Sequence, residues 1–305
     1  MERVRSGRSF ATRTVQARQR GHAIFTVTCS FVREGSGGAN TQAASHAAPM
    51  PEGAEPPPPD DYDSTKDREH PAGWSDDEGD CEDDGKVPSP FESYRIRITG
   101  GGDADGDGDG HNDKKKQQQP AHARKTRQWV RARGRISAEG GHQAHLSALA
   151  YISDSYFIGT VGRIHRLWRF PVAVDDVARL PAAARARVEK LHRFDGNGPL
   201  ESFRGRPEIG MMVSLDHTIY FHNPKRVRAD EWMFTEMESP WAGDGRGVVT
   251  QRIFAKDGTL LATCFQEVSF LSLSFLFSLF SFLLFSLQFY FHYDVVVCKQ
   301  DRLIT

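Results

Sequence analysis

The chain has 305 residues, of which 26% are charged and 38% hydrophobic, and its formal net charge is -1. This length fits one large domain or two ordinary ones. Nucleic-acid binding is not expected, because no folded element carries a basic face, and a secretory signal is not expected, because Met1 to Phe10 is polar and rich in arginine.

A β-hairpin is predicted at residues 8–33. Apolar and small polar residues alternate from Phe25 to Phe31, which is the pattern of a half-buried strand. The preceding strand is expected from Ser9 to Arg18. A lone hairpin is only marginally stable in water, so these strands must pair with other structure, and no further strand is expected upstream of them.

Residues 34–123 are predicted to form a largely disordered linker. Gly, Ala, Pro and acidic residues dominate from Glu34 to about Lys86, and such a segment buries too little apolar surface to offset the entropy lost on ordering. A short patch from Val87 to Ile98 regains the character of folded chain. The run that begins at Asp103 mimics a calcium loop, but Lys114 stands where that motif needs its last acid, so a linker is favoured there.

Residues 124–267 are predicted to fold as one α+β domain. A strand at residues 127–134 leads into a helix from His142 to about Ser155, where apolar and small residues recur at helical spacing on one face. A second, more exposed helix is expected from Asp175 to Phe194.

Four strands are expected after these helices. They are predicted at Met211–His222, Glu231–Ser239, Arg246–Ala255 and Thr259–Glu267. The last two are joined by an Asp-Gly pair, which is a strong signal for a tight hairpin. One buried helix followed by an antiparallel sheet is an α+β layer pattern in which the sheet wraps around the helix.

Five segments in this domain resemble the acyl-CoA thioesterase II family. The segments are LSALAYISD at 146–154, VSLDHTIYFH at 213–222, ADEW at 229–232, ESP with GRG between 238 and 247, and TCFQE at 263–267. Each motif alone is weak, but their order and spacing fit the second hot-dog repeat of that family. Residues 1–33 look like the closing strands of an incomplete first repeat.

The resemblance implies two hot-dog folds in one chain, with acyl-CoA bound between them. It also implies a catalytic trio, which falls by motif on Asp154 of the helix, Ser214 of the first long strand and Gln266 of the last strand. Asp154 would take a proton from water, Ser214 and Gln266 would orient that water, and a backbone N–H near the helix would serve the oxyanion. No Gly-x-Ser-x-Gly turn surrounds Ser214, which argues against an acyl-serine mechanism.

Each of these residues has a structural alternative. Asp154 ends the apolar face of its helix, where a carboxylate is costly unless it is hydrogen-bonded, or it bonds its own backbone at the helix end. Ser214 is otherwise an ordinary strand serine and Gln266 an edge-strand amide. Because adjacent strand residues point to opposite faces, Asp216 and His217 are not expected to form a dyad, and His217 is expected to be structural.

The last part of the chain changes in composition. From Val268 to Tyr293 there is no Asp, Glu, Lys or Arg, and the length fits a membrane-spanning helix. No basic cluster flanks the segment closely, and it interrupts the family pattern after Glu267. Residues 268–305 are therefore expected to be a low-complexity tail that is not native, with a membrane as partner only if the tail is real, and the chain is expected to be truncated at its N-terminus.

The expected function is hydrolysis of fatty acyl-CoA to free fatty acid and CoA by an activated water. The alternative is a truncated, non-catalytic module that binds acyl-CoA. No metal or other cofactor is expected, since the four cysteines form no CxxC pair and lack the histidine spacing of a zinc site. A homo-oligomer is compatible with the sequence. The resemblance suggests a peroxisomal or cytoplasmic location, although the final residues, Leu303 to Thr305, are not a peroxisomal address.

Overall fold

The computed structural model describes residues 1–33, 44–67, 89–100, 119–136, 140–170, 172–195 and 198–272. The chain divides into two compact units, Met1–Ala48 and Pro49–Thr305. The tail expected from residue 273 onward and the Asp103 run lie outside the described residues.

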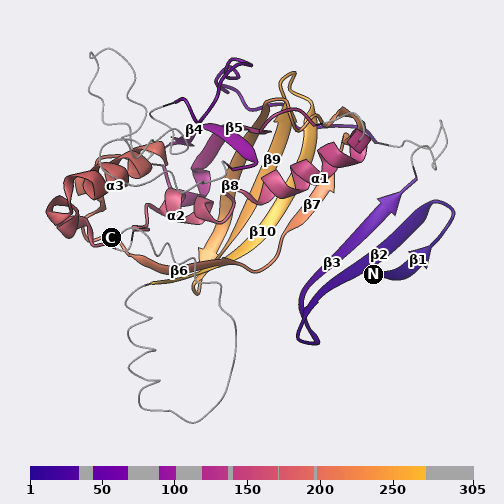
Figure 1. Ribbon diagram of the computed structural model, residues 1–305, viewed down its shortest axis with the longest axis horizontal. Coiled ribbons are helices and arrows are strands. Elements are labelled where there is room, and N and C mark those ends of the chain that lie inside the picture. Colours follow the sequence, from indigo (N-terminus) through magenta and orange to yellow (C-terminus); the bar gives the residue numbers. More distant parts are fainter. Residues whose placement is uncertain are drawn as a thin grey trace, which may run out of the picture. The chain divides into compact units, whose positions relative to one another are not determined.

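The first unit contains a three-stranded antiparallel sheet in the order β1-β2-β3 (Figure 1). Its strands are β1 (Glu2–Ser6), β2 (Phe10–Gln19) and β3 (His22–Val32). Arg20 and Gly21 close the β2–β3 hairpin with φ values of 49° and 82°, as a two-residue hairpin turn requires. The hairpin was expected, but the expectation that no strand precedes it was wrong. All of β1 is exposed. Because neither face of this strand is buried, its sequence need not alternate between apolar and polar residues, and that alternation is the pattern from which strands are predicted.

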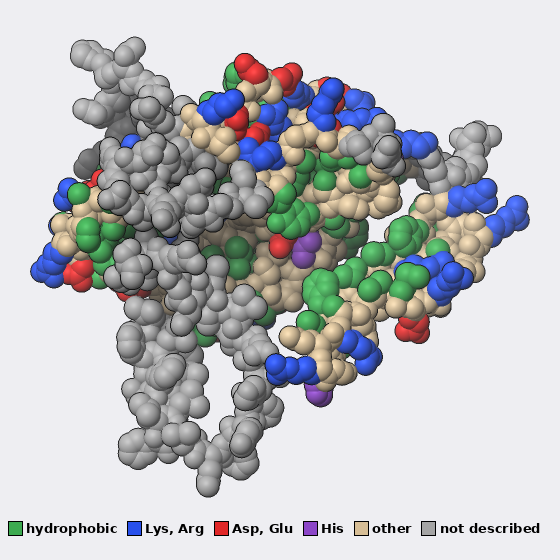
Figure 2. Space-filling view, viewed as in Figure 1, with side chains coloured by type: hydrophobic (Ala, Val, Ile, Leu, Met, Phe, Trp, Pro, Cys, Tyr) green, Lys and Arg blue, Asp and Glu red, His purple; other side chains and the backbone are tan. Residues whose placement is uncertain are grey.

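One face of this sheet is apolar and exposed. The register places Ala11 opposite Phe31, Val15 opposite Val27 and Ala17 opposite Phe25, so these side chains share a face. Figure 2 shows a row of hydrophobic side chains along this sheet, and Phe25 and Phe31 both count among the exposed large hydrophobic residues.

The second unit is built on a curled antiparallel sheet in the order β4-β5-β8-β9-β10-β6, in which β7 also pairs with β10 (Figure 1). The strands are β4 (Phe91–Thr99), β5 (Lys125–Ala132), β6 (Ile209–Ser214), β7 (Thr218–Phe221), β8 (Met233–Gly243), β9 (Arg246–Ala255) and β10 (Leu260–Ser272). The β9–β10 turn uses Gly258 at a φ of 83°, and the Asp257 side chain accepts a hydrogen bond from the Thr259 N–H, so the Asp-Gly signal is confirmed.

Two helices, α1 (Gly141–Asp154) and α2 (Gly159–His165), lie across one face of this sheet (Figure 1). The inner face of α1 buries Leu149 and Ile152 against β5, β8, β9 and β10, in a core that includes Val249 and Ile253 of β9 and Cys264 of β10. A sheet wrapped around one long helix is the α+β hot-dog arrangement that the sequence predicts.

The opposite face of the sheet is covered by residues 49–67, which lie in the range expected to be a largely disordered linker. The indole of Trp129 donates to the carbonyl of Glu55, and that of Trp232 to the carbonyl of Pro59. Arg131 donates to the carbonyls of Asp60 and Tyr62 at 2.9 and 2.6 Å. The composition of the segment could not show this docking, because the donors are distant in the sequence. Of the patch expected at 87–98, residues 91–98 lie in β4.

The other departures from expectation have local causes. The helix predicted at 175–194 is divided at Pro181 into a 3-10 helix, η4 (Val174–Arg179), and α3 (Ala182–Phe194), because proline has no N–H to continue the helix. Residues 268–272, expected to belong to the tail, continue β10 and pair with β6. Among the described residues, no helix has the length and apolar character needed to cross a membrane.

Candidate active site

Asp154 and Gln266 meet where α1 ends above β10. The Nε2 atom of Gln266 donates to Oδ1 of Asp154 at 2.6 Å. Gln266 follows Cys264 by two positions along β10, so its side chain lies on the inner face with the core and is only 1% exposed. The Asp154 side chain is 58% exposed. The sequence argument placed the carboxylate in the apolar layer, whereas the amide is the buried partner and the carboxylate remains open to water.

Ser214 lies on the same face of the sheet without contacting that pair. It is the last residue of β6 and pairs with Val268 of β10, whose side chain is buried in the core. Directly paired residues share a face, so Ser214 is the diagonal neighbour of Gln266, at about 7–8 Å for such a pair. Within the described ranges, the Ser214 hydroxyl makes no hydrogen bond to Asp154 or Gln266. The structure thus joins two of the three predicted residues and places the third beside them.

The strand predicted at 211–222 is interrupted next to this site. Residues 215–217 separate β6 from β7. The N–H of Leu215 donates to the carbonyl of Glu267, and the N–H of Glu267 donates to the carboxylate of Asp216 at 2.7 Å. The Asp216 side chain therefore replaces a backbone acceptor at the break, and the next residue, His217, turns toward α1.

The imidazole of His217 lies against the end of α1. Nε2 lies 2.9 Å from the hydroxyl of Ser153, and Nδ1 lies 4.0 Å from Oδ1 of Asp154. The ring of Phe157 packs edge-on against the imidazole at 5.5 Å. Burial lowers the pKa of His217 in spite of the nearby carboxylates of Asp154 and Asp216, so the imidazole is neutral at pH 7. Sequence reasoning assigned His217 a structural role because nothing in the sequence marked the strand break that turns it.

Cys264 lies below the site and is not a nucleophile. Its thiol is fully buried, and burial raises its pKa to about 12 although a hydrogen bond with Ser153 opposes this shift. A thiol with this pKa stays protonated at neutral pH and does not attack a carbonyl. The groups available for chemistry at this site are therefore a carboxylate, an amide, a hydroxyl and a neutral imidazole.

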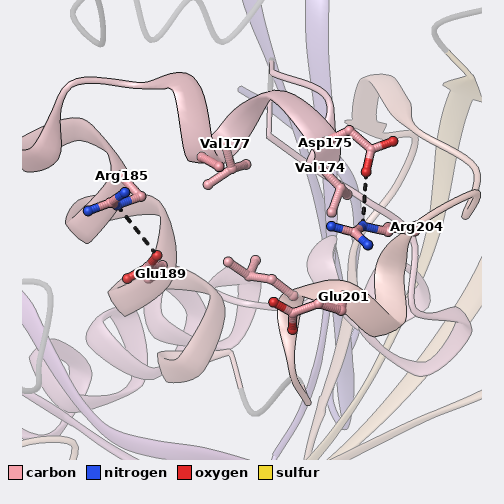
Figure 3. A pocket seen from close by; sticks show the side chains of 9 residues that line it. Val174, Asp175, Val177, Arg185, Glu189, Glu201 and Arg204 are labelled. Carbon is pink, nitrogen blue, oxygen red and sulfur yellow. Dashed lines mark ion pairs between the residues drawn. The ribbon is translucent and has the colours of Figure 1, made fainter.

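A separate cavity of about 280 Å³ lies between η4, α3 and the 3-10 helix η5 (Leu200–Phe203) (Figure 3). Four of its charged lining residues form two ion pairs, Arg204 with Asp175 at 2.9 Å and Arg185 with Glu189 at 3.9 Å. None of its lining residues belongs to α1 or to β10. This cavity is therefore distinct from the Asp154 site.

The basic loop considered for CoA phosphates forms a short 3-10 helix, η6 (Pro224–Arg226). Arg226 pairs with Asp257 of the β9–β10 turn, and Arg228 donates to the carbonyl of Val227. These contacts fit the alternative of a solvated loop, because Arg226 is already neutralised within the chain.

Comparisons with known proteins agree on one family. Residues 52–270 match the family model described as acyl-CoA thioesterase C-terminal domain. Acyl-coenzyme A thioesterase 8 of Mus musculus is 32% identical over 271 residues, which are 88% of this chain and 65% of the mouse protein. The Homo sapiens protein of the same name is 31% identical over 273 residues, with the same two coverages. The chain thus spans 65% of the length of these curated relatives.

Among solved structures, the acyl-CoA thioesterase II TesB2 from Mycobacterium marinum is similar. The sequences are 25% identical and the TM-score is 0.49, over 90% of this chain and 73% of the bacterial chain.

Proposed function

The chain belongs to the acyl-CoA thioesterase family, and from this membership we propose that it hydrolyses fatty acyl-CoA to a free fatty acid and CoA. The observation that carries the proposal is the hydrogen bond between Asp154 and the buried amide of Gln266. It fixes a carboxylate that water can reach at the end of the central helix, as hydrolysis by an activated water requires.

In the proposed reaction, Asp154 acts as the general base. Its carboxylate takes a proton from a water molecule while the water oxygen bonds to the carbonyl carbon of the thioester. The tetrahedral intermediate then collapses, the carbon–sulfur bond breaks, and the CoA thiolate takes the proton from Asp154. No bond forms between the acyl group and the protein.

Gln266 and Ser214 have supporting roles in this reaction. The Gln266 amide holds the Asp154 carboxylate in one orientation, because its own side chain is buried and its backbone is paired with Val249 of β9. The hydroxyl of Ser214, on the same face of the sheet, orients water or substrate from the strand side. The same proposal includes a role in lipid metabolism and a peroxisomal or cytoplasmic location, which rest on the resemblance to the family.

The decisive experiment measures release of free thiol from acyl-CoA substrates of short, medium and long chains. We expect the wild-type chain to release thiol and Asp154→Asn to lose about 10²- to 10⁴-fold in kcat, which is the usual contribution of a general base. Glu189→Gln on α3, far from the site, is the matched control and should retain activity. Full turnover by Asp154→Asn would refute the role of Asp154 as general base. Binding of acyl-CoA without turnover by the wild type would refute the proposed thioesterase activity.

A further inference from the structure

The turn between α1 and α2 contains a strained residue close to Asp154. Tyr156, two residues after that aspartate, has a φ of 66°, in the left-handed region that a side chain as bulky as tyrosine rarely occupies. Ser155, between them, is extended, with φ -68° and ψ 137°, and its N–H donates to the carbonyl of Ile152. The helix that carries Asp154 therefore ends through a backbone conformation that only surrounding contacts can maintain.

Contacts with β4 and with α2 hold Tyr156 in this conformation. Its phenol oxygen lies 2.6 Å from the hydroxyl of Ser93 on β4, and its ring packs edge-on against Phe91 at 6.1 Å. Its carbonyl accepts hydrogen bonds from two residues of α2, from the hydroxyl of Thr160 at 3.2 Å and from Nη1 of Arg163 at 3.3 Å. Both the side chain and the backbone of the strained residue are thus fixed.

Arg163 is itself fixed by burial and by an ion pair. Its Nη2 atom lies 3.1 Å from Oδ1 of Asp195, the residue that caps α3, and both side chains are buried. A Cβ atom added at Gly159, the first residue of α2, would lie 2.5 Å from Nη1 of Arg163, so the guanidinium fills the space that this glycine leaves open. A buried charge is costly unless it is paired. This one is paired with the end of α3 while it donates to the turn after α1.

The position of Asp154 depends on this turn. Asp154 is the last residue of α1, and its exposed side chain bonds the buried Gln266 amide through one carboxylate oxygen. Helix ends fray unless contacts beyond the last turn hold them. A displacement of this end of α1 would move the carboxylate away from its amide partner.

We propose that Tyr156 is a positioning residue, whose left-handed turn keeps the carboxylate of Asp154 at the amide of Gln266. The contacts with Ser93 and Arg163 maintain that turn. The inference rests on the proposed thioesterase activity, in which Tyr156 touches no reacting atom. Its effect is on the chemical step, because backbone strain beside a catalytic group serves to fix that group before the reaction.

Two substitutions release the turn in different ways. Tyr156→Phe removes the phenol bond to Ser93 and keeps the ring against Phe91. Gly159→Ala displaces the Arg163 guanidinium from the carbonyl of Tyr156 without a change of charge, and alanine favours a helix more than glycine does. Each should lower kcat for acyl-CoA hydrolysis about tenfold, since a misplacement of about 1 Å in an active site can cost 10²-fold. Each should leave KM nearly unchanged, as expected when ground-state binding is not affected.

Tyr62→Phe is the matched control for the tyrosine variant. The phenol of Tyr62 donates to Asp67 at 2.8 Å, in the segment that covers the opposite face of the sheet. The substitution therefore removes a hydrogen bond of the same kind far from Asp154. The Tm should fall by a similar amount in the two Phe variants, whereas kcat should fall only in Tyr156→Phe. Equal losses of kcat in both would overturn the inference.

A double variant tests whether Tyr156 acts through Asp154. The proposed base is absent in Asp154→Asn, so adding Tyr156→Phe should leave the residual kcat unchanged, because residues that act as one unit do not have additive effects. A further tenfold loss in the double variant would show that Tyr156 supports only the fold and would overturn the inference while thioesterase activity stands. Wild-type kcat in both Tyr156→Phe and Gly159→Ala would do the same. A wild-type chain that releases no thiol would overturn both proposals.

Discussion

At the scale of single residues, Gln266 offers a direct test of the site. Its replacement by Leu removes the donor to Asp154 but keeps a side chain of similar volume in the core. We expect kcat for acyl-CoA hydrolysis to fall about 10²- to 10³-fold, which is the loss typical of one removed donor in an active site. The free energy of unfolding should change little, because a buried polar group with an unpaired oxygen is exchanged for an apolar one.

Gln251 provides the matched control for this substitution. It is buried on β9, pairs with Cys264 across the sheet and also has an Oε1 atom without a described partner. Gln251→Leu should therefore resemble Gln266→Leu in stability and retain wild-type kcat. Equal activity losses in the two variants would mean that the sheet, rather than the bond to Asp154, controls turnover.

The resemblance to the family, and not periodicity, suggested the members of this site. It assigned Asp154 and Gln266 to one site, and the two side chains are hydrogen-bonded. The exposure of Asp154 was not predictable, because a residue at a helix end is exposed or covered according to what packs beyond it. The orientation of His217 was not predictable either, since it depends on a strand break at which the Asp216 carboxylate accepts a hydrogen bond from the backbone of Glu267.

At the scale of elements, the packing of α2 on the sheet depends on one glycine. A Cβ atom added at Gly247 of β9 would lie 2.8 Å from Cγ2 of Val161, which is buried in α2. Val161 is β-branched and has little freedom to turn aside. We expect Gly247→Ala to lower the free energy of unfolding by about 1–3 kcal/mol, as is usual for an overpacked core, which chemical denaturation would measure.

The double variant Gly247→Ala with Val161→Ala is the control for this contact. Because the two side chains touch, their effects should not add, and the second substitution should recover part of the stability lost through the first. Strict additivity would show that Gly247 matters for its backbone conformation instead of for the space that it leaves to α2.

Elements were predictable where local pattern and tertiary structure agree. The helix expected at 142–155 is α1, and the strand expected at Arg246–Ala255 is β9, because both have clear apolar periodicity and definite ends. The range Met211–His222 reads as one strand but forms two, because its two halves pair with different stretches of β10. Residues 49–67 have no periodicity of their own, and their position is fixed by Trp129 of β5 and by Trp232, the residue before β8.

At the scale of the whole molecule, the lowered pKa values of three histidines indicate how stability depends on pH. Burial is the largest cause that lowers the pKa values of His165, His192 and His217 from their ordinary value of 6.5. Below pH 6.5 the unfolded chain therefore binds protons that the folded chain does not, and proton binding favours unfolding. The contribution of these histidines to the free energy of unfolding is complete above pH 6.5. It is lost as the pH falls toward their lower pKa values in the folded state.

We accordingly expect the Tm to be nearly constant from about pH 7 to 8 and to fall as the pH is lowered through 6. Asp63 and Asp257, whose pKa values are lowered below 3.8 mainly by hydrogen bonds to Thr65 and Thr259, should add to the loss only at lower pH. Thermal denaturation followed by circular dichroism measures the profile. His192→Gln should reduce its slope, and a Tm that rises on acidification would contradict the assignment.

The position of β10 has a mechanical consequence. This strand of 13 residues is hydrogen-bonded to β9 on one edge and to β7 and then β6 on the other. Its hydrogen bonds run perpendicular to the strand, so a force that pulls along β10 loads both ladders in shear, and many bonds must break together before the strand slides. Traction from either end of β10 is thus shared across three neighbouring strands.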